Sequence, residues 1–212
     1  MLIVCPELTE RKYPGAEWYQ EGGIMDTDGH IREKEERTFS AADRIVAEVK
    51  NRTQAAGKII LFGHSAGGQF VHRWALLGGK KNVDVIAVAN SGWFTMPDRD
   101  IDYPYGIKNV GITDEELGEA FAEPVILFMG EKDVERKPPF RDTPEADAQG
   151  MNRMERCMNY FRQCKAKAEE LRVPFRWKLE TVEGVAHQGV KMAEGAAAYI
   201  FGKSSEDGNR RV

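Results

Sequence analysis

The chain has 212 residues, of which 42% are hydrophobic and 30% charged, and its formal net charge is -4. This length suits one domain with a sizeable core and is short for two. The mild negative charge and the lack of a basic block argue against nucleic acid as a partner, because phosphate binding requires clustered Lys and Arg. No apolar stretch is long enough for a membrane span, so we expect no transmembrane segment.

The three cysteines, Cys5, Cys157 and Cys164, are odd in number, and the last two lie seven residues apart in one predicted helix. They suggest neither a disulfide framework nor a metal site. The N-terminal residues 1–7 lack the charged lead and the long apolar region of a signal peptide. We therefore expect a reducing, cytoplasmic location for the chain as given, and the alternative is that an upstream segment is missing.

The first predicted strand spans residues 2–5, an apolar run that ends at Pro6. Residues 7–29 follow as a loop rich in aromatic side chains. Trp18 in this loop either pins it to the core or lines a substrate cleft. An apolar stripe over residues 40–57 then predicts an amphipathic helix.

Residues 59–62 form the next apolar run, and they lead directly into the pattern G-x-S-x-G at residues 63–67. A sharp turn from a strand to a helix leaves no room for side chains flanking the serine, which explains the glycines. Residues 69–77 carry apolar side chains at helical spacing and end at a pair of glycines. We expect Ser65 to stand exposed at the strand end, and the alternative is an ordinary glycine-rich turn.

Three further strands are predicted, over residues 83–89, 125–129 and 175–182. The first two are continuous apolar runs, typical of inner parallel strands, and the third alternates as an edge strand does. Helices are predicted over residues 113–122 and 151–171 and after residue 189. The alternation predicts an α/β fold, a mostly parallel sheet of about five strands with helices on both faces. We predict a single domain over residues 1–203 and a disordered polar tail over residues 204–212.

A serine hydroxyl is a poor nucleophile unless an adjacent base takes its proton. His187 is the best placed of the four histidines, because it lies in a glycine-flanked loop between a strand and a helix, at the same end of the sheet as Ser65. His64 is tied into the turn, His72 lies two helical turns beyond the serine, and His30 belongs to the early polar loop. His187 is therefore the predicted base.

The base in turn needs a carboxylate that orients it and stabilises the imidazolium. Asp133 comes just after the carboxyl end of a buried strand, where Gly130 lets the chain turn. Asp133 is therefore the predicted acid. Its competitors are Glu131 nearby and, after the preceding strand, Asp98, Asp100 and Asp102.

The chain order Ser65, Asp133, His187, together with the alternation of strands and helices, resembles the α/β-hydrolase family, whose triad runs serine, acid, histidine. The resemblance covers residues 2–201 and implies a reduced form of that fold. The turn at residues 63–68 and the loop at residues 184–187 are similar to those of esterases and lipases. The stretches at residues 6–8, 90–93 and 103–106 are similar to bacterial hydrolases of the polyester depolymerase type.

The resemblance implies an oxyanion hole with two backbone donors, one of which would be the N–H of Ala66. The loop that supplies the other donor in the family has no counterpart before Ser65. In one alternative, residues 2–5 form the strand beside the serine strand, and the N–H of Leu8 is the missing donor. In the other, the donor strand is absent, and a second copy of the chain could fill the gap in the sheet, making a homo-oligomer.

The predicted function is a serine hydrolase that cleaves small or polymeric carboxylic esters through an acyl-enzyme on Ser65. The alternative is a hydrolase-like binding protein with little turnover, because its oxyanion hole is incomplete. No metal or organic cofactor is implied. Four residues are candidates for contact with substrate, two after the end of a strand and two nearer the N-terminus: Trp93, Phe94, His64 and Trp18.

Overall fold

The computed structural model describes residues 2–53, 57–78 and 82–208, and its centre is a sheet of four parallel strands in the order β1-β2-β3-β4. The register pairs His64 with Ala89, and Gly130 with Val182, so neighbouring strands end at nearly the same level. The strands are β1 (Ile60–His64), β2 (Val85–Ala89), β3 (Val125–Gly130) and β4 (Lys178–Val182). The predicted α/β class and the edge position of the last strand are confirmed.

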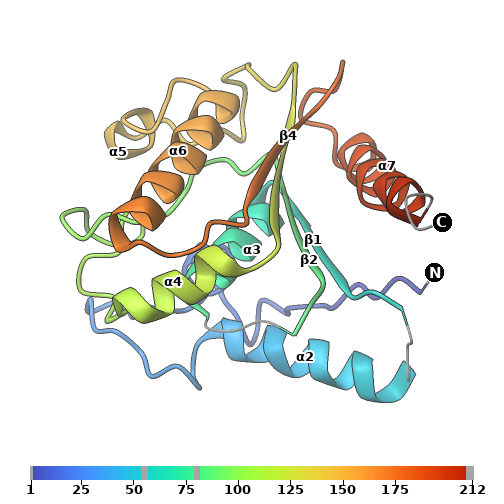
Figure 1. The fold of residues 1–212 in the computed structure, drawn as a ribbon. Helices are drawn as coiled ribbons and strands as arrows, with labels where there is room; N and C mark the ends of the chain where they lie inside the picture. Colours follow the sequence, from blue (N-terminus) through green and yellow to red (C-terminus); the bar gives the residue numbers. More distant parts are fainter. Residues whose placement is uncertain (1, 54–56, 79–81, 209–212) are drawn as a thin grey trace.

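Helices connect the strands and cover both faces of the sheet (Figure 1). Helices α3, α4 and α6 lie on one face, and α7 lies alone on the other among the described elements. The helices are α1 (Gly15–Trp18), α2 (Thr38–Thr53), α3 (Ala66–Leu77), α4 (Asp114–Ala122), α5 (Pro144–Asp147), α6 (Arg153–Leu171) and α7 (Gly189–Gly208).

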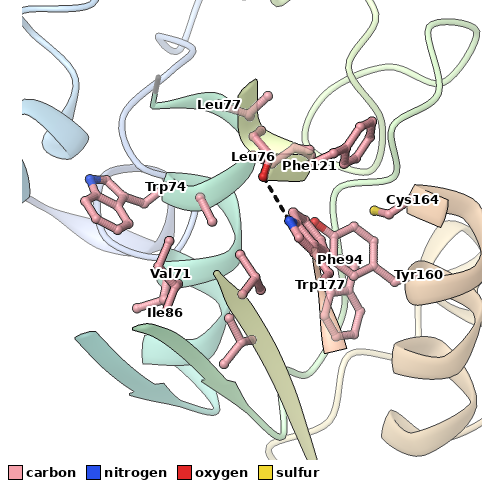
Figure 2. Packing of buried hydrophobic residues seen from close by; sticks show 14 of the residues in the cluster. Val71, Trp74, Leu76, Leu77, Ile86, Phe94, Phe121, Tyr160, Cys164 and Trp177 are labelled. Carbon is pink, nitrogen blue, oxygen red and sulfur yellow. Dashed lines mark hydrogen bonds between the residues drawn. The ribbon is translucent and has the colours of Figure 1, made fainter. Parts of the chain in front are cut away.

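The larger core lies between the sheet and the helices α3, α4 and α6 (Figure 2). The ring of Tyr160 stacks on Phe94 at 4.5 Å between centroids, and the indole of Trp177 donates a hydrogen bond of 2.8 Å to the carbonyl of Ala120. Apolar residues dominate both inner strands, as burial on two faces requires. This packing holds the carboxyl ends of the strands in fixed positions.

The predicted strand at residues 2–5 is wrong. These residues are irregular, and the side chains of Leu2, Ile3 and Val4 are 67%, 71% and 48% exposed. An apolar run indicates a tendency to be buried, but a strand forms only beside another strand that accepts its hydrogen bonds. Strand β1 pairs with β2 alone in the described part of the chain, so it is an edge strand and the sheet has four strands instead of about five.

Helix α7 continues to Gly208, so the predicted tail at residues 204–212 is described only as far as that residue. Residues 209–212 lie outside the described part. The helix predicted over residues 40–57 begins at Thr38 and ends at Thr53. Among the described residues, no helix combines the length and the apolar character that crossing a membrane requires.

Candidate active site

Ser65 stands between the end of β1 and the start of α3, with backbone angles of φ 55° and ψ −114°. A positive φ costs a residue with a side chain about 1–3 kcal/mol, so the surroundings must impose it. A Cβ on Gly63 would lie 2.3 Å from the carbonyl oxygen of Gly67, and one on Gly68 would lie 2.8 Å from that of Ala89. Gly63 and Gly68 are therefore required because backbone fills the space beside them, whereas a Cβ on Gly67 would meet only the hydroxyl of Tyr19, at 3.4 Å.

Ser65, His187 and Asp133 form a continuous chain of hydrogen bonds. Nε2 of His187 lies 2.9 Å from Oγ of Ser65, and Nδ1 of His187 lies 2.7 Å from Oδ2 of Asp133. A carboxylate only accepts, so Nδ1 carries the hydrogen and Nε2 is free to accept the serine proton. The geometry brings together the three residues that the sequence predicted to act together.

Asp133 is 2% exposed and lies in the turn after β3. Its backbone N–H donates to the carbonyl of Gly130, and a Cβ on Gly130 would lie 2.6 Å from the carbonyl of Val185. Glycine is therefore needed here so that the loop carrying His187 can pass directly over the end of β3.

Asn90 holds this loop in place and was not singled out from the sequence. Its Oδ1 accepts from the N–H of Gly130 at 2.8 Å, and its Nδ2 donates to the carbonyl of Ala186 at 3.1 Å. The side chain thereby connects the end of β3 to the residue before His187. The positive φ of 45° at Asn90 is a conformation that Asn tolerates better than most residues, and this preference is the signal that could have identified it.

The competing carboxylates have other partners or are exposed. Glu131 accepts the N–H of Gly184 at 2.8 Å, which helps to shape the histidine loop. Asp98 accepts the N–H of Asp100, an exposed residue, at 2.8 Å. Asp102 forms an ion pair with Lys108.

Two of the remaining histidines are kept neutral by burial. His64 lies with its ring 4.7 Å from that of His187, and burial followed by the nearby charge of His187 lowers the pKa of His64 to about 4. His72 accepts the N–H of Thr95 at Nε2 and bonds the carbonyl of Gly68 through Nδ1, and burial lowers its pKa well below the usual value. His72 is thus a structural residue that ties α3 to the loop after β2.

Of the two predicted oxyanion donors, Ala66 is the first residue of α3. The first N–H groups of a helix have no partner within it, and the N–H of Ala66 donates to no acceptor in the described part of the chain. Leu8 lies half-buried in the irregular N-terminal segment. No hydrogen bond within the described ranges joins it to the elbow, which is the sharp turn at residues 63–68 that carries Ser65.

Trp93 and Phe94 were expected at the substrate cleft, but the structure buries both. Phe94 is fully buried in the core, where its backbone N–H and carbonyl both bond the side chain of Gln149. Trp93 is 2% exposed, and the guanidinium groups of Arg73 and Arg141 lie over its ring, at 4.1 and 5.0 Å from the centroid. The expectation of substrate contact is corrected for both, because the chain turns inward directly after β2.

An aromatic residue of the N-terminal loop does reach the elbow, but it is Tyr19. Its hydroxyl lies 3.4 Å from where a Cβ on Gly67 would stand, and its ring stacks on Phe70. Burial raises the pKa of this hydroxyl. The predicted Trp18 instead packs beneath the guanidinium of Arg32 at 4.1 Å and beside Gly23. The aromatic residues of the loop at residues 7–29 indicated that one of them reaches the site, but the sequence did not show whether it is Trp18 or Tyr19.

One group of side chains in the described ranges has the composition of a metal site: Asp26, Asp28 and His30, whose ligand atoms lie within 4.8 Å of one another. Oδ1 of Asp26 already accepts the backbone N–H groups of the other two residues, at 2.9 and 2.8 Å. These contacts explain the cluster as a stabilised turn, and we assign it no metal.

No protein-family model and no curated protein sequence matches the chain. Solved structures do match it, and two of them are at least 30% identical in sequence. The first, poly(aspartic acid) hydrolase-1 from Sphingomonas sp. KT-1, is 33% identical over 90% of this chain and 73% of its own, with a TM-score of 0.84. The second, LpqC, a poly(3-hydroxybutyrate) depolymerase from Bordetella parapertussis, is 30% identical over 92% of this chain and 67% of its own, also with a TM-score of 0.84.

Both similar proteins are hydrolases, and their likeness extends over nearly all of the described fold. The comparisons support hydrolase activity in general. With the parallel sheet and the strand, sharp turn and helix around Ser65, they lead to one conclusion: the chain belongs to the α/β-hydrolase family.

Proposed function

We propose that this protein is a serine hydrolase of carboxylic esters, in which Ser65 is the nucleophile, His187 the general base and Asp133 the orienting acid. The single observation that carries the proposal is the hydrogen-bonded chain from Oγ of Ser65 through His187 to Asp133, with distances of 2.9 and 2.7 Å. A serine with a positive φ at the end of a strand, bonded to a correctly protonated histidine, is the arrangement that activates a hydroxyl.

In the first half of the reaction, Nε2 of His187 takes the hydroxyl proton while Oγ of Ser65 attacks the ester carbonyl. The imidazolium that forms is stabilised by Asp133, and it then protonates the departing alcohol. An acyl-enzyme remains on Oγ. Water, deprotonated by the same nitrogen, attacks the acyl group, and His187 returns the proton to the serine.

Negative charge on the carbonyl oxygen is stabilised by backbone dipoles. The N–H of Ala66 is the donor we propose, because it stands at the start of α3 directly after the nucleophile and has no other acceptor in the described part of the chain. The positive end of the α3 dipole adds to this effect.

The three residues define the type of reaction more closely than they define the acyl and leaving groups of the substrate. One similar protein acts on poly(aspartic acid), a polyamide, and the other on poly(3-hydroxybutyrate), a polyester. The same three residues can cleave either bond. We favour esters, because ester cleavage makes fewer demands on protonation of the leaving group than amide cleavage does.

The test is covalent labelling by a fluorophosphonate probe, combined with a chain-length series of p-nitrophenyl esters and one matched p-nitroanilide. We expect the wild type to be labelled and to hydrolyse the esters faster than the anilide, and Ser65→Ala to do neither. A labelled Ser65→Ala variant would contradict the assignment of the nucleophile. A wild type that remains unlabelled would contradict the activated serine itself.

A second candidate function is supported by the N-terminal side of the site. Residues 2–8 are irregular and mostly exposed, and none of them has a hydrogen bond to the elbow within the described ranges. Losing one oxyanion donor typically lowers turnover about a hundred- to a thousandfold. Labelling of Ser65 without turnover of any ester in the series would favour a binding protein that retains an activated serine.

A further inference from the structure

Asp133 is held from two opposite sides, and the proposed function uses only one of them. Oδ2 faces Nδ1 of His187, whereas Oδ1 accepts a hydrogen bond from Nη1 of Arg153 at 3.2 Å. The side chains of this ion pair are 4% and 2% exposed, for Arg153 and Asp133 respectively. A charge this deeply buried requires a compensating charge, and neutral imidazole does not supply one.

Arg153 is itself immobilised. It is the first residue of α6, and the preceding Asn152 caps that helix by accepting the N–H of Glu155. Nη2 of Arg153 donates to the carbonyl of Pro139 at 2.6 Å, and the Arg153 guanidinium lies 5.0 Å from the centre of the Phe140 ring. The cation is therefore held in one position by a long helix and by the loop after β3.

The groups that face the Arg153–Asp133 pair come from several elements. Strand β1 contributes His64, which is neutral at pH 7, and α6 contributes the permanent cation of Arg153. When His187 is neutral, the positive charge of the Arg153 guanidinium and the negative charge of the Asp133 carboxylate compensate each other. With protonated His187, one uncompensated positive charge remains in a partly buried site, which is unfavourable. Glu131 and Lys132, in the turn after β3, are exposed to water, which screens them. Arg156, one turn further along α6, is fully buried and bonds the carboxylate of Asp147, which Arg136 also pairs with.

We propose that Arg153 is a positioning residue of the hydrolase: it aims the Asp133 carboxylate at His187, and its positive charge offsets the attraction of that carboxylate for a second proton on the His187 ring. This inference rests on the proposed function of Ser65. The guanidinium touches no reacting atom and acts entirely through the carboxylate.

The test compares Arg153→Met, which removes the charge, with Arg153→Lys, which keeps it, through profiles of kcat/KM against pH from 5 to 9. In Arg153→Met we expect the acidic limb of the profile, where kcat/KM falls as His187 takes up a proton, to move to higher pH by about one unit. The direction follows because a positive charge near the ring has been removed. The size is that of a unit charge several Å away at an effective dielectric constant near 20. In Arg153→Lys the limb stays within about 0.3 unit of the wild type, while kcat falls about threefold, because the fork geometry is lost.

A matched control is Arg156→Met, three residues along the same helix. Arg156 is also fully buried, but it bonds the carbonyls of Gly92 and Gly150 and the carboxylate of Asp147. Its loss should lower the unfolding temperature and leave the acidic limb in place. A purely structural role for Arg153 predicts the same result for Arg153→Met, and that result would overturn the inference.

A replacement variant and an NMR measurement test the role of Arg153 independently of turnover. If Arg153→Met does not fold, Arg153→Gln, which keeps a donor without the charge, replaces it. NMR titration of the His187 ring in wild type and variant reports the same displacement without any turnover. A displaced titration in a protein that no fluorophosphonate labels would refute the proposed function and retain the role of Arg153. If the probe labels Ser65 but the His187 titration is the same in wild type and variant, the proposed function is retained and the role of Arg153 is refuted.

Discussion

The two sides of the site differ sharply in how they are built. On the side of β3 and β4, Asp133, His187 and Asn90 are joined to one another or to backbone by hydrogen bonds. On the opposite side, β1 is an edge strand with Phe62 36% exposed, and residues 2–8 run past without regular structure. The three residues of the proposed proton relay are therefore fixed by hydrogen bonds, whereas the described N-terminal residues that face the proposed oxyanion site have no such bonds to the turn at residues 63–68.

The largest effect is expected from replacing the proposed acid, Asp133. We expect Asp133→Asn to lower kcat about a thousand- to ten-thousandfold, because an amide can donate to His187 and favour the wrong tautomer. Stopped-time assays with a p-nitrophenyl ester measure the loss. Glu131→Gln, at the nearby exposed carboxylate, is the control and should stay within about threefold of wild type. A larger loss in Glu131→Gln than in Asp133→Asn would reassign the acid.

The elbow connects the two sides, and its first glycine, Gly63, should be sensitive to added atoms. A Cβ on Gly63 would lie 2.3 Å from a backbone oxygen that cannot move aside, so Gly63→Ala should lower the free energy of unfolding by about 3 kcal/mol or leave the protein unfolded. Urea unfolding measures this. Gly57→Ala, where a Cβ meets nothing within 4 Å, should change the stability by no more than about 0.5 kcal/mol. Equal urea midpoints for both variants would show that the elbow is not sterically constrained.

Acid should lower the stability of the fold through His72, which ties α3 to the loop after β2. Burial lowers the folded-state pKa of this residue, so below about pH 6.5 the unfolded chain takes up a proton that the folded chain does not, and stability falls as the pH falls. The slope approaches about 1.4 kcal/mol per pH unit for this one group. Urea unfolding at pH 7.5 and 5.5 should show a smaller loss on acidification in His72→Gln than in wild type. An unchanged pH dependence would contradict the prediction.

The smallest effect is expected on the N-terminal side. Leu8→Pro removes the backbone N–H that the sequence nominated as an oxyanion donor, and Leu8→Ala retains it. Because Leu8 lies in an irregular segment with no hydrogen bond to the elbow in the described chain, both variants should have kcat within about threefold of each other. If Leu8→Pro instead falls about a hundredfold below Leu8→Ala, the N–H of Leu8 is the first oxyanion donor.

Much of the candidate site could be predicted because its signals are local. The pattern at residues 63–67 records a steric requirement of a single turn, and apolar runs followed by Gly130 and Gly184 mark where strands end. In a parallel sheet those ends lie together, so Ser65, Asp133 and His187 could be grouped from their positions in the chain. The α/β class followed from the same alternation of strands and helices.

Tertiary structure alone decided what surrounds these residues. Residues 2–5 are as apolar as a strand, but pairing depends on a neighbour that no local pattern reports, and here they are exposed. Phe94 follows a strand end, yet the chain turns into the core because Gln149, far away in sequence, bonds its backbone. Arg153 has no recognisable local signal, since a charged residue at the start of a helix normally faces water. Its role arises only because the loop after β3 folds over it and excludes that water.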